Sequence, residues 1–278
     1  MLKKCLKYDI GAIYKLWSIA AAVFLSMSVP VGFAIRFMLL YGTENALVMI
    51  LGVVAELVAS VAVSAFALMT MIAICVRYYK SFFSDEGYLT FTLPVKRSTL
   101  FYSKVLNAVI WQVATAIVIA LAVAIVAIIL PSADSTNNGS LIISILTDLP
   151  FESIGGWGAL MIVEVAMLAM LALLAETLFI YFCITLGSVI AKKQKIIVSV
   201  GIWYLINQIV LPMATIALAV LGFLMITSCY GAFPELEEAE VNALLALVSL
   251  VVDLAVAAIC AVLTFVNIDS IERKLNLT

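Results

Sequence analysis

The chain has 278 residues, of which 66% are hydrophobic and only 12% are charged, with a formal net charge of -2 at pH 7. Soluble domains carry about 45–50% apolar and about 25% charged residues, so this composition excludes an ordinary soluble protein and indicates an integral membrane protein. No nucleic-acid partner is expected.

The first 17 residues, MLKKCLKYDIGAIYKLW, place apolar side chains at helical spacing and keep the lysines off that stripe. This pattern predicts an amphipathic helix at the inner membrane interface, with Tyr14 and Trp17 at the level of the lipid headgroups. The alternative is the charged flank of a first membrane span. That span is expected to stay, because the apolar run continues to residue 40 without a small-residue cleavage site.

Long apolar stretches follow along the chain. A helix needs roughly 20 apolar residues to cross about 30 Å of hydrocarbon. Lipid cannot satisfy backbone polar groups, and the alternation typical of barrel strands is absent, so these stretches predict helices. The predicted fold is therefore all-α, a single membrane domain with six transmembrane helices, at residues 16–40, 46–76, 105–130, 159–191, 196–226 and 243–266.

Basic residues are distributed unevenly around these spans. All but Arg36 of the 15 Lys and Arg residues fall in the N-terminus, the second loop, the fourth loop and the C-terminal tail. The positive-inside rule therefore puts both termini and these two loops in the cytoplasm, and we expect a bacterial plasma (inner) membrane. The outer loops are acidic. Either exported loops simply lack basic residues, or their field attracts cationic amphiphiles.

The second loop carries the stretch SDEGYLTFTLPVKRSTL, residues 84–100. Ser84 is a suitable N-cap, and Asp85 and Glu86 then occupy the first helical turn, where the helix dipole favours acids. Gly87 permits a turn or a close approach, and Pro94 ends the element. The pattern predicts a short cytoplasmic helix.

This short helix would bear Tyr88, Leu89, Phe91 and Leu93, after which Ser98 is predicted to cap the third span. Exposed aromatic residues flanked by charges are typical of a docking surface. The alternative is an interfacial loop that packs on lipid headgroups.

Several kinds of catalytic chemistry are excluded. The chain has no histidine, no G-x-x-x-x-G-K-[ST] nucleotide-binding loop and no C-x-x-C pair. It therefore lacks the residues of His-based metalloprotease sites, His-based triads and a P-loop of its own. We expect that the chain is not an enzyme by itself, and that it binds no metal and no cofactor.

Ionisable residues inside membrane spans are costly and usually face a bundle interior or a water-filled cavity. One interpretation is that they line a cargo path, with Glu176 and Asp253 foremost and a cationic cargo favoured. The other is that they form hydrogen bonds between helices, including an Arg36–Glu56 pair. The residues concerned are Arg36, Glu56, Glu164, Glu176 and Asp253.

The stretch SDEGYLTFTLPVKRSTLFYSKVL, with Leu93-Pro94-Val95-Lys96-Arg97-Ser98 at its centre and Ser103-Lys104 after it, resembles the coupling region of ABC-2-type permeases, the membrane subunits of ABC exporters. The basic N-terminus is similar to the connecting helix of that family. The resemblance implies one ABC-2-like transmembrane domain over residues 1–278. Its parts would be a connecting helix (1–15), a cytoplasmic coupling loop (78–100) and two outer loops (131–157 and 227–242).

The resemblance also implies a partner. ATP and Mg would be bound by a separate ABC ATPase subunit, and a second permease copy or a paralogue would complete the transporter in the lipid membrane. Residues 84–93 would contact the ATPase, and Lys96 and Arg97 would contact it or anionic lipid. The implied ATPase-coupling residues are Ser84, Asp85, Glu86, Gly87, Tyr88, Leu89, Phe91, Leu93, Pro94, Lys96 and Arg97.

The expected function is thus that of a permease subunit that exports an amphiphilic or peptide-like cargo. Two alternatives stay open. A secondary transporter would favour paired intramembrane charges and internal repeats, and no repeat is evident. A membrane scaffold or immunity protein without transport activity would need only the acidic outer loops and the docking loop.

Overall fold

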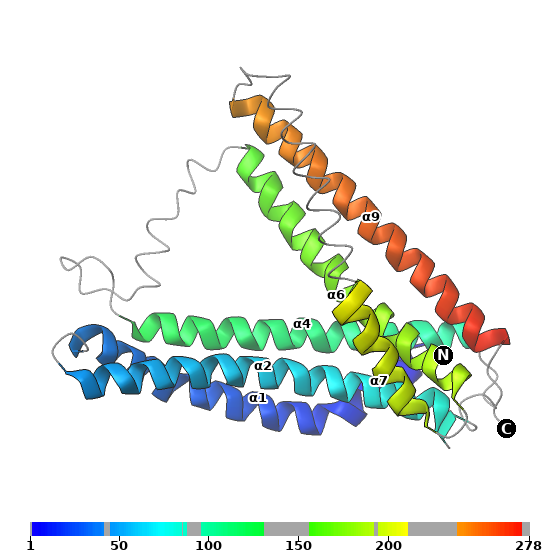
Figure 1. Cartoon of the computed structure of the whole chain (residues 1–278), viewed down its shortest axis with the longest axis horizontal. Helices are drawn as coiled ribbons and strands as arrows, with labels where there is room; N and C mark the ends of the chain where they lie inside the picture. The colour runs from blue at the N-terminus through cyan, green and yellow to red at the C-terminus, as the bar shows by residue number, and fades with distance from the viewer. Residues whose placement is uncertain are drawn as a thin grey trace. The chain divides into compact units, whose positions relative to one another are not determined.

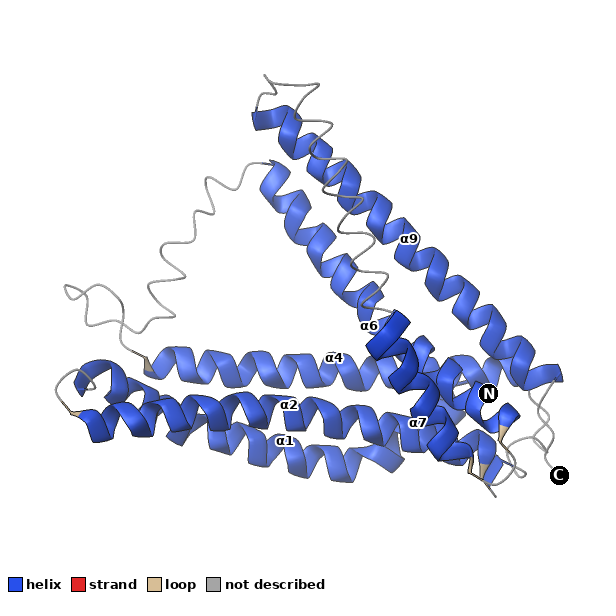
Figure 2. Cartoon of the chain, in the orientation of Figure 1, coloured by secondary structure: helices blue, strands red, loops and turns tan. Residues whose placement is uncertain are grey.

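The computed structural model describes residues 2–41, 45–84, 86–87, 96–130, 156–191, 194–210 and 238–273. Within these ranges the chain forms helices and short connections, with no strand, as Figure 2 shows. The prediction of an all-α fold is confirmed. The helices are α1 (Leu2–Tyr41), α2 (Ala46–Phe83), α4 (Arg97–Ile129), α6 (Gly156–Ile190), α7 (Lys195–Leu205), the π-helix η1 (Ile206–Val210) and α9 (Glu238–Arg273) (Figure 1).

Five of the described helices are long and apolar enough to cross a membrane. These segments are Lys3–Tyr41, Ala46–Phe83, Arg97–Ile129, Ala166–Ile190 and Leu250–Glu272. The chain is therefore a multi-pass membrane protein. The predicted span at 196–226 is described only as far as Val210, so the count of six stays a prediction.

The helices extend further than the apolar runs that predicted them. α1 begins at Leu2, so the predicted connecting helix and the first span are one continuous helix, about 60 Å long at 1.5 Å per residue. α2 continues to Phe83 and α4 begins at Arg97, so both helices reach into the predicted coupling loop.

The predicted N-cap of α4 is wrong. The backbone oxygen of Lys96 accepts hydrogen bonds from the N–H groups of Thr99, at 3.0 Å, and Leu100, at 3.3 Å. The first helical turn therefore starts directly after Lys96, and Ser98 lies inside this turn instead of capping it.

Contacts divide the chain into two compact units, each described by itself below. The first contains Met1–Tyr78 and Tyr102–Ser153, and the second contains Tyr79–Phe101 and Ile154–Thr278. The end of α2, the segment that follows and the start of α4 thus belong to the second unit. The prediction of a single membrane domain stays a prediction.

In the first unit, aromatic side chains join α1 to α2 and α4. The ring centroid of Trp17 lies 5.0 Å from that of Trp111 and 6.0 Å from that of Phe66, and Phe24 stacks on Phe66 at 4.9 Å. Trp17 therefore packs against neighbouring helices, and its predicted level at the lipid headgroups stays a prediction. Its ring packs against the buried cluster of Ala21, Phe66 and Val118.

A hydroxyl group connects the same three helices. The indole Nε1 of Trp17 donates to Oγ1 of Thr115 at 3.0 Å, and this hydroxyl lies 3.1 Å from Oγ1 of Thr70. Thr115 and Thr70 are buried, so these hydrogen bonds form where neither water nor lipid competes for the same groups.

Replacing Thr115 with Val, which has nearly the same shape, should lower the free energy of unfolding by about 1–3 kcal/mol, because the indole N–H loses its acceptor. Unfolding in detergent followed by tryptophan fluorescence measures this loss. Thr264→Val is the matched control, since the Thr264 hydroxyl donates at 2.7 Å only to Cys260 O of its own helix. An equal effect of both changes would contradict the interhelical role.

In the second unit, α6 and α9 lie side by side and run in the same direction (Figure 1). The thiol of Cys260 lies 3.9 Å from the backbone oxygen of Leu171, and Nδ2 of Asn267 donates to that of Leu178 at 3.2 Å. Each contact joins residues 89 positions apart. Because this difference stays constant over seven residues of each helix, the two helices pack in parallel.

α6 and α7 form a helical hairpin whose backbones come very close. Gly187 of α6 faces Ser199 of α7, and both are buried. Ser199 Oγ donates to Lys195 O of its own helix at 2.7 Å and lies 3.4 Å from Ile184 O of α6. Glycine permits this approach because it has no side chain.

Candidate functional site

The segment between α2 and α4 was predicted to couple the chain to an ATPase, and the structure describes its two ends. After α2, the N–H of Gly87 donates to Ser84 O at 2.7 Å and closes a tight turn. Gly87 is buried, and a Cβ at this position would lie 2.7 Å from Phe82 O. The turn therefore requires glycine, because a backbone atom cannot move aside as a side chain can.

The predicted coupling residues are only partly described. Glu86 and Lys96 are exposed, and Glu86–Gly87 is helical, so the predicted short helix stays a prediction beyond this point. Ser84, Glu86, Gly87, Lys96 and Arg97 are described, whereas Asp85, Tyr88, Leu89, Phe91, Leu93 and Pro94 lie outside the described residues.

Buried aromatic residues anchor both ends of this segment. Phe82 and Phe83 end α2 with ring centroids 6.2 Å apart, and Phe101 in the first turns of α4 meets the ring of Tyr181 edge-on at 6.3 Å. The start of α4 thus packs against α6.

Arg97 makes contacts inside the chain. Its Nη1 donates to the backbone oxygens of Ile271, at 3.1 Å, and Glu272, at 3.0 Å. These oxygens belong to the last turn of α9, where the helix dipole is negative and favours a guanidinium. The structure thus gives Arg97 a partner that the sequence did not suggest, and its predicted contact with an ATPase or lipid stays a prediction.

An ion cluster lies at the end of the first unit that is predicted to face the cytoplasm. The carboxylate of Asp9 in α1 is fully buried. It accepts Lys104 Nζ of α4 at 2.6 and 2.7 Å, and Arg77 Nε of α2 at 2.9 Å. We call these three residues the Asp9 cluster. Two cations surround one buried carboxylate, so removing the acid removes a negative charge that both of them contact.

The Asp9 cluster joins the two helices that carry the coupling segment. Arg77 lies shortly before Phe83, where α2 ends, and Lys104 lies shortly after Arg97, where α4 begins. The sequence pattern did not predict this cluster, because its cations lie 68 and 95 residues from Asp9 along the chain. The available signal was a single acid among lysines, at a position where the helical spacing of the apolar residues predicts an apolar side chain.

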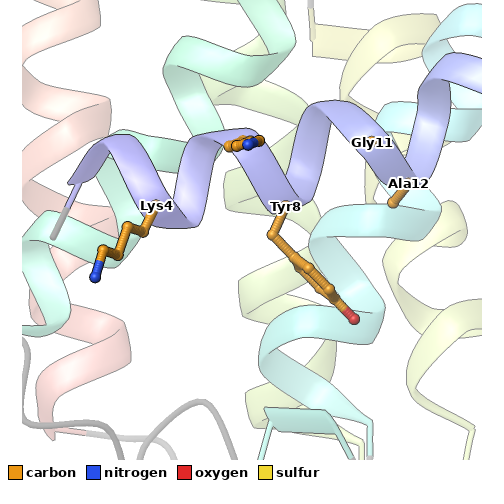
Figure 3. Close-up of a pocket in the computed structure, with 5 residues that line it drawn as sticks. Lys4, Tyr8, Gly11 and Ala12 are labelled. Atoms are coloured by element: carbon orange, nitrogen blue, oxygen red, sulfur yellow. The ribbon is translucent and has the colours of Figure 1, made fainter.

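A basic hollow of about 550 Å³ lies on α1 next to this cluster. Lys4 and Tyr8 project to the same side of the helix, and Gly11 leaves a notch beside Ala12 (Figure 3). Lys7 completes the lining. The guanidinium of Arg77 lies 4.9 Å from the centre of the Tyr8 ring, a cation–π contact. This surface belongs to the stretch that was predicted to lie at the inner membrane interface.

The predicted Arg36–Glu56 pair is wrong. Arg36 Nη1 donates to Ile129 O at 2.8 Å, at the C-terminal end of α4, and Glu56 is exposed on α2. Among the described residues of the first unit, these two side chains form no ion pair with each other. The negative end of the α4 dipole offers the guanidinium a closer partner.

The other ionisable residues of the predicted cargo path belong to the second unit. Glu176 is exposed on α6, whereas Asp253 of α9 is buried, and neither of its carboxylate oxygens has a hydrogen-bond partner among the described residues. Glu164 lies in the first half of α6, and its side chain is outside the described part. A common path for all five residues stays a prediction.

Comparison of the chain with family models, with curated proteins and with solved structures gives no match.

Proposed function

We propose that the chain is the permease subunit of an ATP-driven exporter of the ABC-2 type. It moves an amphiphilic or peptide-like cargo across the plasma membrane, with ATP and Mg bound by a separate ATPase subunit. The observation that carries this proposal is the Asp9 cluster, which fastens both helices of the predicted coupling segment to the N-terminal helix. This connection would let the coupling segment transmit a movement of the ATPase to the membrane helices.

The mechanism follows from these contacts. A push on the coupling segment reaches Arg77 in α2 and Lys104 in α4, and Asp9 passes it to α1. The three helices then move as one body, which is how exporters switch between inward-open and outward-open states. The close turn at Gly87 and the buried Phe82 hold the first residues of the coupling segment in place.

The parallel packing of α6 and α9 supports the proposed six spans. Since both helices run in the same direction, we expect one further span between Ile190 and Glu238, a region that begins with α7 and η1. This span would give six in total. With the basic loops inside, both termini then lie in the cytoplasm of a bacterial cell.

The proposal is tested by purifying the tagged protein from its host in mild detergent and identifying its partners by mass spectrometry. A soluble subunit with a P-loop, recovered in stoichiometric amount, is the expected result. Recovery of this chain alone from a native membrane extract would contradict it and would favour the secondary transporter or the scaffold. Transport by the purified chain alone in vesicles, driven by an ion gradient, distinguishes these two.

Gly87→Ala should reduce the recovered ATPase subunit at least about tenfold, because a methyl group 2.7 Å from Phe82 O forces the turn open and displaces the docking surface. The pull-down measures this ratio. Gly201→Ala is the matched control, since nothing lies within 4 Å of a Cβ there. Wild-type recovery with Gly87→Ala would show that the turn does not present the partner surface.

A further inference from the structure

An apolar hollow of about 340 Å³ lies among α1, α2 and α4 of the first unit. Its lining consists of apolar side chains and a single hydroxyl, that of Ser28. This hydroxyl already donates to Leu25 O at 2.7 Å. A buried water makes about 2–4 hydrogen bonds, so the hollow gives water too few polar partners.

The hollow is closed at the end that lies toward the Asp9 cluster. There the ring of Phe24 forms part of the lining and stacks on the buried Phe66 at 4.9 Å. Ile35 of α1 and Leu130, directly after α4, form the other end. The lining follows α1 for about 16 Å, from Phe24 to Ile35. Spread over this length, about 340 Å³ corresponds to a width of about 5 Å.

This width limits what can enter the hollow. A helix is about 10–12 Å across with its side chains, so a helix of another chain is too wide. An extended hydrocarbon chain is one carbon wide, and carbons that are not bonded pack about 4 Å apart. The hollow therefore fits one hydrocarbon chain.

A cation lies at the open end. Arg36 directly follows Ile35, is exposed, and donates from Nη1 to Ile129 O at 2.8 Å. Among the described residues this is its one hydrogen bond, and Glu56 of α2 forms no ion pair with it. A guanidinium has five N–H donors, in a geometry that suits phosphate. Arg36 can therefore bind an anion at the end of the hollow.

The surroundings of these helices supply such a molecule. An empty hollow leaves its lining without van der Waals partners. Lipid chains are as apolar as the lining, so a chain enters from the bilayer at little cost and gains these contacts. We propose that the hollow binds one acyl chain of a phospholipid, with the lipid phosphate on Arg36. This site does not depend on the proposed export function.

The test uses the purified full chain in an amphipol, with native mass spectrometry to measure the fraction that carries one bound molecule. One probe is palmitoyl lysophosphatidylglycerol. The other is monopalmitoylglycerol, which has the same chain without a phosphate. For the wild-type chain we expect one lysophospholipid per chain and about tenfold weaker binding of the neutral probe, because only the phosphate gains charge-assisted hydrogen bonds.

Ala62→Phe places a ring in the hollow and should weaken the binding of both probes at least about tenfold. Ala65→Phe is the matched control, since Ala65 is exposed on the same helix and outside the lining. Arg36→Gln should abolish the preference for the phosphate probe, whereas Glu56→Gln should keep it. If Ala62→Phe does not fold, Ala127→Leu fills the hollow from α4.

The proposal is overturned if the wild-type chain binds neither probe, or if Ala62→Phe binds both as the wild type does. Equal loss with Ala65→Phe, or an unchanged preference with Arg36→Gln, would also contradict it. A dimer without bound lipid that Ala62→Phe dissociates would show that a second copy of the chain covers the hollow instead.

Discussion

Replacing Asp9 with Ala should lower the free energy of unfolding by about 3–5 kcal/mol, the largest loss we expect from any single change in the first unit. The carboxylate is fully buried and accepts three bonds of 2.6 to 2.9 Å from Lys104 and Arg77. Without it, both cations lose this buried acceptor and their mutual repulsion is no longer reduced by it. Chemical unfolding of the purified protein in mixed micelles measures the loss.

Two further variants make this prediction specific. Lys104→Met should cost less than Asp9→Ala, because Asp9 keeps its bond to Arg77 at 2.9 Å. Lys7→Ala changes an exposed lysine on the same helix and should leave the free energy of unfolding nearly unchanged. If Asp9→Ala were no more harmful than Lys7→Ala, the ion cluster would not stabilise the unit.

Gly187→Ala should lower the free energy of unfolding of the second unit by roughly 1–3 kcal/mol, and should open the α6–α7 hairpin. An alanine Cβ would lie 2.6 Å from the backbone nitrogen of Ser199 and 2.7 Å from its Cα. Both atoms belong to the main chain, so no rotamer change relieves the clash and the helices have to separate. Unfolding in mixed micelles measures the cost.

Two further variants test whether the clash involves the backbone of Ser199 and not its side chain. Ser199→Ala removes the hydroxyl but keeps N and Cα, so adding it to Gly187→Ala should not restore stability. Gly201→Ala on α7 has open space around its Cβ and should stabilise by about 0.5–1 kcal/mol, since Gly disfavours helix interiors. Rescue by Ser199→Ala would mean that the side chain, and not the backbone, sets the helix spacing.

The apolar runs predicted the cores of α2, α4, α6 and α9 well, because a long uncharged stretch in lipid has few alternatives to a helix. They failed at the helix ends. Hydropathy stopped the second span at Val76 and began the third at Val105, yet the helices continue through Arg77 and Lys104. Lys and Arg are good helix formers, and both residues form ion pairs with Asp9, which is far away in sequence.

The sequence likewise predicted only part of the candidate site. The sequence identified Asp253 as an ionisable residue at depth, and the structure confirms that it is buried. The sequence pattern grouped Asp253 with Glu176, because both residues lie deep in their predicted spans. Which acid shares its level depends on the direction and register of α9 against α6, and these are set by the contacts of Cys260 and Asn267. A composition or hydropathy pattern carries no information on such a register.

The position of Arg77 within α2 has a mechanical consequence. From Arg77 to the end of the helix at Phe83 is about 9 Å, whereas from Arg77 back to Ala46 is about 47 Å. If the three helices joined by Asp9 tilt together about this cluster, α2 is a lever with arms of about one to five. A displacement of about 1 Å at Phe83 would then move Ala46 by about 5 Å, which is close to the rise of one helical turn. In the proposed exporter, a small stroke at the coupling segment would thus produce a larger movement at the far end of α2.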